Sequence, residues 1–338
     1  MEASHPNHQL AVEGSALIQR SDRALIEVQG RDRASWLHNL TTNQVKTLGV
    51  GEGNYSFALN LQGRILFDLN LFVRANSIWI DLDRRFLETA KKHFNKYTIT
   101  EDVTLIDRTS EFTRVGIIGR RSAELVAAMG VGNAAAMASL AQSVFAWGGV
   151  EVGVVRHDFC GPMGFELFVP VAASEGFEKA IFQGEFGQPV QRISAEVVET
   201  LRVEAGIPWP GSEITDEYLP AETRQLERGV SYLKGCYLGQ EVVERMRSRN
   251  VVARQLVGLR VPNHTLSSIG GAILTETGDT VGRVTSAVLS PRLGCGIALG
   301  YVKFSHSAPQ STVLLDAPNG RMSASVEALP FVDFFKRN

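Results

Sequence analysis

The sequence is poor in cysteine, with Cys160, Cys236 and Cys295 as the three examples among 338 residues. An odd number of widely spaced cysteines does not build a disulfide framework, and it fits a reducing compartment better. Thiolate-held iron–sulfur clusters usually need four cysteines, more than this chain has. His157 lies three residues before Cys160, a spacing that two metal ligands can have, but no second pair accompanies it. We therefore predict no metal site within the chain alone.

Long apolar runs and an excess of one charge are missing as well. No apolar stretch approaches the roughly 20 residues that a membrane-spanning helix needs. The 34 basic and 36 acidic residues leave a net charge of −2, which gives no general attraction to nucleic acid or to an anionic membrane. Residues 1–14 are polar and resemble neither a secretory signal nor a transit peptide. These absences predict a soluble, cytoplasmic protein without nucleic-acid or membrane partners.

The length and the residue pattern predict more than one domain. A chain of 338 residues exceeds what one hydrophobic core usually organises. Up to about residue 250, strand-like runs of period two alternate with helical patterns. After Asn250 the sequence changes to short β-branched runs with frequent glycine and proline. The sequence therefore predicts an α+β region followed by an all-β module.

Two carboxylates stand at positions that merit attention. Predicted strands over residues 55–59 and 64–73 are joined by a turn-like stretch, and period two places Asp68 on the mixed face of the second strand. Glu166 belongs to a strand-like run that begins with a glycine. Buried carboxylates are uncommon unless they are paired, so either residue would indicate a site if it lay in a cleft. The alternative is that each is a solvated residue on a sheet face.

The most unusual local sequence is Lys-Gly-Cys-Tyr-Leu-Gly-Gln-Glu at residues 234–241. It places Cys236 beside a glycine, which lets a ligand or partner approach the main chain closely. The ammonium of Lys234 and the start of a predicted helix over residues 240–247 would both favour the reactive thiolate. The alternative is a small, buried and inert cysteine in a tight turn. The residues alone support the two interpretations about equally.

This segment carries a family resemblance. Residues 234–241 resemble the signature of YgfZ-type proteins at every fixed position, namely Lys234, Gly235, Cys236, Tyr237, Gly239, Gln240 and Glu241. Other stretches resemble the wider aminomethyltransferase (GcvT) superfamily in the same order along the chain: 40–43, 60–64, 164–166, 201–206, 282–286, 298–302 and 329–331. The resemblance extends from about residue 17 to residue 331.

The resemblance implies both a fold and a ligand. The fold would be aminomethyltransferase-like folate-binding α+β domains, antiparallel sheets with helices, in two interleaved subdomains over residues 15–250, followed by a C-terminal β-barrel domain over 251–338. Tetrahydrofolate or a one-carbon derivative would be the cofactor, held in a central channel. A pterin presents adjacent N–H donors, which a carboxylate can accept in bidentate fashion. The folate contacts expected from the resemblance are Glu166, Asp68, Arg202 and Tyr55, and the catalytic candidates are Cys236, Lys234 and Asp68.

Departures from the superfamily pattern bear on the activity. The aminomethyltransferases resembled here carry two adjacent aspartates after their glycine-rich turn, whereas this chain has Phe67 and Asp68. They have an arginine where this chain has Val198, and they lack the cysteine signature. These departures favour the YgfZ-type branch, which implies an accessory factor acting with iron–sulfur assembly or client proteins. The alternative is an aminomethyltransferase that transfers a one-carbon unit, so whether the chain is an enzyme stays open.

Overall fold

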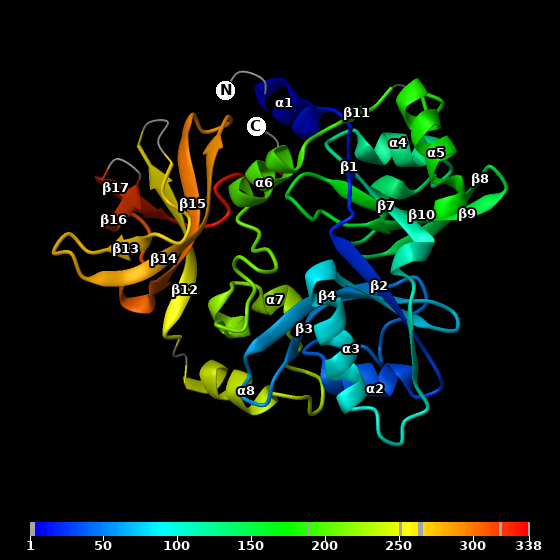
Figure 1. The fold of residues 1–338 in the computed structure, drawn as a ribbon, viewed down its shortest axis with the longest axis horizontal. Helices are drawn as coiled ribbons and strands as arrows, with labels where there is room; N and C mark the ends of the chain where they lie inside the picture. Colours follow the sequence, from blue (N-terminus) through cyan, green and yellow to red (C-terminus); the bar gives the residue numbers. More distant parts are fainter. Residues whose placement is uncertain (1–3, 188, 250–251, 263–265, 318–319, 337–338) are drawn as a thin grey trace.

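The computed structural model describes residues 4–187, 189–249, 252–262, 266–317 and 320–336. Two sheets with helices lie beside a closed six-stranded β-barrel, and the segment from α6 to α8 runs between the sheets and the barrel (Figure 1). The predicted fold class, an α+β region followed by an antiparallel β-barrel, is confirmed. The predicted domain boundary falls at residues 250 and 251, which lie outside the described residues.

The five-stranded sheet is antiparallel and has the strand order β3-β4-β5-β2-β6. Helices α2 and α3 cover one of its faces, where Trp36 and Phe94 pack at a centroid distance of 5.3 Å. The elements are β2 (Arg23–Gln29), α2 (Arg33–Leu40), β3 (Gly53–Leu59), β4 (Ile65–Val73), β5 (Ile78–Asp83), α3 (Leu87–Lys96) and β6 (Thr104–Asp107).

Strand β4 shows the alternation expected from its sequence. Phe67 and Leu71 are buried in the core between this sheet and its helices. Asp68 and Asn70 alternate with them and lie on the other side of the sheet, where a cavity is found. Period two in the sequence therefore placed Asp68 on the side of β4 that faces this cavity.

The six-stranded sheet has the order β11-β1-β7-β10-β9-β8 and is antiparallel except for the pair of β1 and β11. Helices α4 and α5 pack on it through apolar side chains such as Leu125 and Phe177. The elements are β1 (Ala16–Gln19), β7 (Phe112–Ile118), α4 (Ser122–Ala128), β8 (Gln142–Trp147), β9 (Val150–Arg156), β10 (Gly164–Pro170), α5 (Val171–Gln183) and β11 (Gln191–Arg192).

The chain crosses between the two sheets. Strand β1 belongs to the six-stranded sheet and β2 to the five-stranded one, so residues 20–22 form the first crossing. The chain returns between β6 and β7. Because the crossings are short, the charged residues that follow β1 lie at the junction of the two sheets (Figure 1).

Helix α6 (Ala195–Glu204) joins the sheets to the barrel. Its Val198 and Leu201 pack against β1, whereas Val203 packs against the outer face of the barrel, with Leu256 and Leu299. The remaining elements are α7 (Leu226–Gly229), α8 (Gln240–Arg249), β12 (Arg254–Val261), β13 (Ala272–Leu274), β14 (Thr280–Ser290), β15 (Cys295–Lys303), β16 (Thr312–Ala317) and β17 (Gly320–Glu327). The barrel closes in the order β12-β15-β14-β13-β16-β17.

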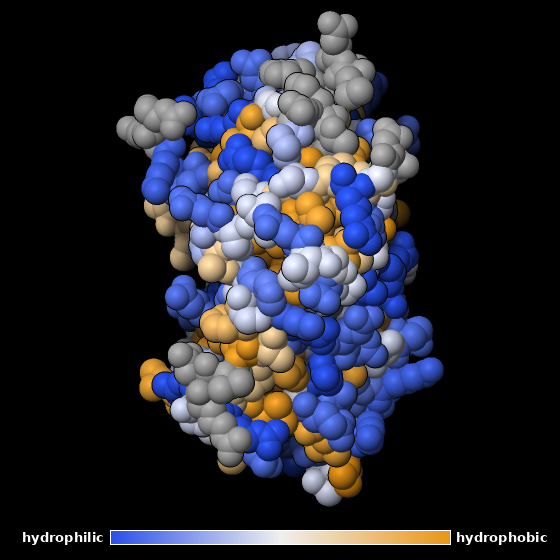
Figure 2. All heavy atoms as spheres, turned by 90° about the vertical axis from the view of Figure 1, so that its left-hand side faces the viewer, coloured by the Kyte–Doolittle hydropathy of each residue, from blue (hydrophilic) through white to orange (hydrophobic). Residues whose placement is uncertain are grey.

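An N-terminal helix, α1 (Ser4–Glu13), was not expected, because its sequence has no clear apolar stripe. It is tied down by a 2.8 Å contact between His8 Nε2 and the buried Glu204 Oε2 of α6. On the barrel side of the molecule, polar residues predominate and hydrophobic ones form separate patches (Figure 2). None of the helices within the described ranges is long and apolar enough to cross a membrane.

Candidate functional site

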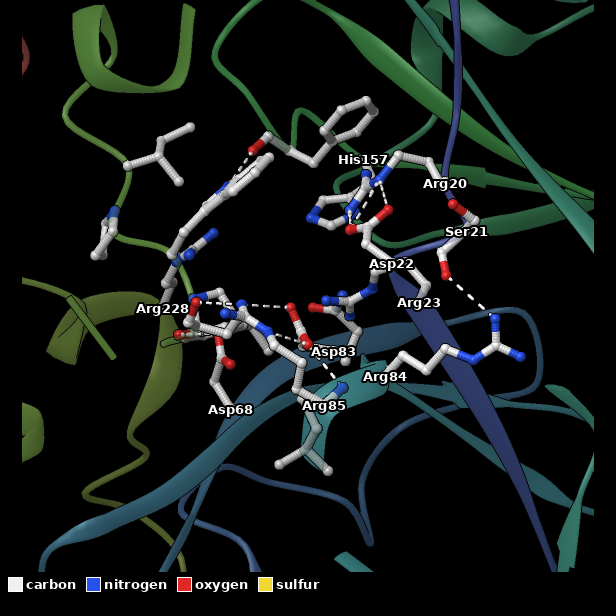
Figure 3. A pocket seen from close by; sticks show the side chains of 18 residues that line it. Arg20, Ser21, Asp22, Arg23, Asp68, Asp83, Arg84, Arg85, His157 and Arg228 are labelled. Atoms are coloured by element: carbon white, nitrogen blue, oxygen red, sulfur yellow. Dashed lines mark hydrogen bonds and ion pairs between the residues drawn. The ribbon is translucent and has the colours of Figure 1, made fainter. Parts of the chain in front are cut away.

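A cavity of about 520 Å³ lies where the two sheets meet the segment after α6 (Figure 3). The first crossing contributes residues 20–23, and the five-stranded sheet contributes Tyr55, residues 68–70 and residues 83–85. His157 and Phe159 come from the connection between β9 and β10, and residues 207–210 and Arg228 complete the wall. Every lining residue thus lies between positions 20 and 228, ahead of the barrel.

Asp68 is the predicted site residue that the structure places most clearly in this cavity. Asp68 is 9% exposed. Its Oδ2 accepts a 2.9 Å hydrogen bond from the hydroxyl of Tyr55, which is another predicted folate contact. Its Oδ1 is buried without a hydrogen-bond partner among the described residues. Burial raises the pKa of Asp68, although Arg23, Tyr55 and Arg228 oppose the rise. A ligand that donates an N–H here would satisfy a polar atom that the protein leaves unpaired.

Phe67, which stands where the superfamily pattern has an aspartate, does not line the cavity. Phe67 packs edge-to-face against Phe94, with ring centroids 5.8 Å apart, in the core beneath α3. Neighbouring residues of a strand face opposite sides of the sheet, so an aspartate at position 67 would also point away from the cavity. The replacement therefore leaves the cavity carboxylate of Asp68 in place, and it carries little weight against a transferase activity.

Glu166 lies behind the cavity wall and does not line it. Its side chain is 2% exposed, and both oxygens are engaged. Oε1 accepts from Arg20 Nη1 at 3.1 Å and contacts His157 Nδ1 at 2.8 Å, whereas Oε2 accepts from Arg114. Burial alone would raise the pKa of Glu166, but Arg20 and Arg114 outweigh it and hold this pKa well below its ordinary value. The expected pterin contact at Glu166 stays a prediction.

The ion pairs continue across the junction of the two sheets. Arg114 also donates to Asp81 Oδ1 at 2.9 Å, and Arg23 Nε donates to the same oxygen at 3.1 Å. Buried charges of alternating sign thus run from Arg20 through Glu166, Arg114 and Asp81 to Arg23. Buried charges that are paired in this way hold one another in fixed positions. The two end arginines of this ion-pair row line the cavity.

The cavity wall carries more positive than negative charge. Five arginines line it against three aspartates, which leaves an excess of two positive charges when all are ionised. The guanidinium of Arg228 stacks on the ring of Tyr55 at 4.0 Å from its centroid, and Arg85 pairs with Asp83 at 2.9 Å. An excess of arginine in a partly enclosed site favours ligands with carboxylates or phosphates.

Lys234 has a structural role in this fold. Its Nζ is buried and donates to the backbone oxygens of His38, Thr41 and Asn43, the last at 2.8 Å. These oxygens lie at and just after the C-terminal end of α2, where a cation is favourable. Burial, with Lys46 nearby, lowers the pKa of Lys234 to about 7. The expected activation of Cys236 by this ammonium stays a prediction.

Cys236 lies on an exposed loop outside the cavity. A Cβ atom on Gly235 would have no atom of the described residues within 4 Å, so the loop is open at this position. The neighbouring Tyr237 is buried with Tyr55 in the core beside the cavity, and α8 begins at Gln240 as predicted. The expectation of a buried Cys236 is therefore wrong, and the reactivity of its thiol stays a prediction, whereas Cys160 and Cys295 are buried.

Arg202 lies in the interface between α6 and the barrel. Its side chain is 1% exposed and donates to Glu213 Oε2 at 2.9 Å, to Glu199 and to Ser286 of β14. It is not part of the cavity wall, so its expected folate contact stays a prediction. Within the part of the chain that the structure describes, no group of three potential metal ligands comes together.

Sequence reasoning missed several cavity residues. Arg20 and Arg23 were visible as charges between two apolar strands, but their partners lie far along the chain. His157 was considered for metal binding with Cys160, which is buried and separate from the cavity lining. Trp209 and Arg228 belong to irregular or short elements that carry no motif.

Comparison with known proteins identifies the family. The model of the GCVT N-terminal domain matches residues 1–234, which include all the cavity residues. The chain belongs to this family. The model of the glycine cleavage T-protein C-terminal barrel domain matches residues 254–333, in agreement with the observed barrel. The expected membership of the aminomethyltransferase (GcvT) superfamily is thereby confirmed.

Relatives of the GCVT family match along nearly the whole chain. A protein of Natronomonas pharaonis named "Probable aminomethyltransferase" is 27% identical, over 96% of this chain and 90% of its own length. The aminomethyltransferase of Symbiobacterium thermophilum is 25% identical, over 96% and 88%. The crystal structure of the glycine cleavage system aminomethyltransferase T from Bartonella henselae shares the fold, with a TM-score of 0.84 at 20% identity over 98% of this chain and 90% of that one.

Proposed function

We propose that this GCVT-family chain binds a reduced folate in the cavity between its two sheets. The observation that carries the proposal is Asp68, a cavity-lining carboxylate with one oxygen that has no partner in the described structure. A reduced pterin offers N–H donors for such an oxygen. The excess of two positive charges on the wall suits the two carboxylates of a folate glutamate tail.

Calorimetric titration with tetrahydrofolate tests this proposal. We expect clear binding by the wild type and binding about 10- to 100-fold weaker in Asp68→Asn, because the variant loses a charge-assisted hydrogen bond. Asp216→Asn, at an exposed position outside the cavity, is the matched control and should bind like the wild type. Absence of binding by the wild type would contradict the proposal.

For the use of the bound folate, we propose first an accessory role in the assembly or repair of iron–sulfur proteins. The observation in its favour is Cys236, whose loop is exposed beside Gly235 and is accessible to a protein partner. Replacing Cys236 with serine should lower the activity of iron–sulfur enzymes in cells and leave the melting temperature unchanged, because the side chain is exposed. Unchanged iron–sulfur enzyme activity would count against this role.

The second candidate is aminomethyl transfer to tetrahydrofolate. It is favoured by the names of the relatives. It is also favoured by the position of Phe67, which stands where the aminomethyltransferases have an aspartate but lies outside the cavity. An assay of the purified chain with an aminomethylated lipoyl carrier protein and tetrahydrofolate separates the two uses. One-carbon transfer at an enzymatic rate that is lost in Asp68→Asn and retained in Cys236→Ser would favour the transferase. No turnover, together with a cellular effect of Cys236→Ser, would favour the accessory role.

A further inference from the structure

His157 combines a cavity position with a fixed orientation. It follows β9 and lines the cavity on the side opposite Asp68 and Arg228 (Figure 3). Its Nδ1 lies 2.8 Å from Glu166 Oε1, and its side chain is 15% exposed. Its other ring nitrogen, Nε2, makes no hydrogen bond with the described residues and is not completely buried. Nε2 is thus available to a ligand.

The partner of Nδ1 determines which nitrogen carries the proton. Glu166 is held ionised by Arg20 and Arg114, and an ionised carboxylate can only accept hydrogen bonds. Nδ1 must therefore be the protonated nitrogen, which leaves Nε2 of the neutral ring as an acceptor. Burial lowers the pKa of His157 below its ordinary value of 6.5, although Glu166 opposes the shift, so the ring is neutral at neutral pH.

We propose that His157 Nε2 accepts a hydrogen bond from a ring N–H of the ligand, and that Glu166 is a positioning residue that acts through His157. This inference rests on the proposed folate binding and assigns to His157 the contact expected of Glu166. The ligand class is a heterocycle with N–H donors on two edges, one for Asp68 and one for His157. Glu166 lies behind the cavity wall in this arrangement, and its oxygens are engaged by Arg20, His157 and Arg114.

Two amide substitutions of His157 distinguish the roles of its two ring nitrogens. His157→Asn retains an amide N–H near the Nδ1 position, so it can still donate to Glu166 but has no acceptor at the Nε2 position. His157→Gln reaches the Nε2 position with its amide but gives up the bond to Glu166. We expect tetrahydrofolate binding to weaken about tenfold in His157→Asn and by about threefold or less in His157→Gln. Equal melting temperatures of the wild type and His157→Asn would exclude a folding defect.

The pH dependence of binding adds a readout that a purely structural role would not change. Protonation of Nε2 converts the acceptor into a donor, so wild-type affinity should fall as the pH is lowered through the pKa of His157, which burial places below its ordinary value. The charged groups facing the ring are Glu166 from β10, Arg20 after β1 and Asp81 from β5, with Asp68 across the cavity. These groups are retained in His157→Asn, so the ratio of wild-type to variant affinity isolates the histidine and should approach one in acid.

Nitrogen-15 NMR of the free protein tests the orientation without ligand. The wild-type ring should show a protonated Nδ1 and a bare Nε2 at neutral pH, and this signature should change in Glu166→Gln. A bare Nδ1 in the wild type, or equal tetrahydrofolate affinity of the wild type and His157→Asn at every pH, would overturn the inference while leaving the proposed function intact. Failure of the wild type to bind tetrahydrofolate would overturn both.

Discussion

Gly239 lies directly against the turn that contains Gly63. A Cβ atom on Gly239 would come within 3.3 Å of the Gly63 Cα and within 2.6 Å of the Asn60 carbonyl oxygen, and Gly239 has a φ of +82°. The cysteine loop and the glycine-containing turn after β3, which are separate in the sequence, are therefore in backbone contact. This contact fixes the loop relative to the strands that carry Tyr55 and Asp68.

Gly239→Ala should destabilise the protein by about 2 kcal/mol, because alanine disfavours the left-handed backbone and its methyl group would displace the turn. Gly235→Ala is the matched control, since its Cβ would meet open space. Urea denaturation of the two variants measures the difference in free energy of unfolding. Equal stability of the two would show that the loop does not pack as described.

Arg114 connects two buried carboxylates, Glu166 and Asp81, with a side chain that is 5% exposed. Arg114→Met should lower the free energy of unfolding by about 3–5 kcal/mol, because each carboxylate would lose a cation on which its buried charge depends. Arg321→Met, at an exposed pair 3.8 Å from Asp316, should cost about 1 kcal/mol or less. Comparable losses of unfolding free energy in the two variants would contradict a stabilising role of the ion-pair row.

The stability should depend on pH through Glu166 and Asp81, whose pKa values are both lowered in the fold because nearby arginines outweigh the effect of burial. Below the unfolded-state pKa of about 4, the unfolded chain takes up these protons first, so the free energy of unfolding falls with decreasing pH. The fall should be shallower in Glu166→Gln than in the wild type. Glu88→Gln, at an exposed pair with Lys91, serves as the control. Parallel pH profiles of the wild type and Glu166→Gln would contradict this role.

The three cysteines should differ sharply in reactivity. Cys236 is exposed, whereas Cys160 and Cys295 are buried, and burial raises the pKa of Cys160 to about 12. Iodoacetamide should therefore label Cys236 in the native protein. Cys160 and Cys295 should be labelled only after denaturation. Peptide mass spectrometry measures the extent of labelling at each site. Native labelling of Cys160 at a rate similar to that of Cys236 would contradict the fold around the cavity.

Much of the fold could be predicted from local patterns. Period two on β4 placed Asp68 on the face of the sheet opposite to that of Phe67. The shift to short β-branched runs after Asn250 identified the barrel region. These features depend on neighbours within a few residues, which is the range over which a single sequence is informative.

The ion-pair row was not predictable in the same way. Glu166 pairs with Arg20, which is 146 positions away in the sequence, and with Arg114, which is 52 positions away. No local pattern shows which strands become neighbours. A lone glutamate in a strand is therefore compatible with a solvated sheet face as well as with a ligand contact. The role of Lys234 at the end of α2 was hidden for the same reason, because the two segments are almost 200 positions apart.

The central claim is that the cavity between the two sheets holds a reduced folate, and a crystal structure of the chain with tetrahydrofolate tests it most directly. The account predicts a pterin ring between Asp68 and His157, with a ring N–H directed at each, and the glutamate carboxylates toward the arginines at the wall. A pterin bound elsewhere on the molecule, or an empty cavity at a saturating concentration of tetrahydrofolate, would contradict the account.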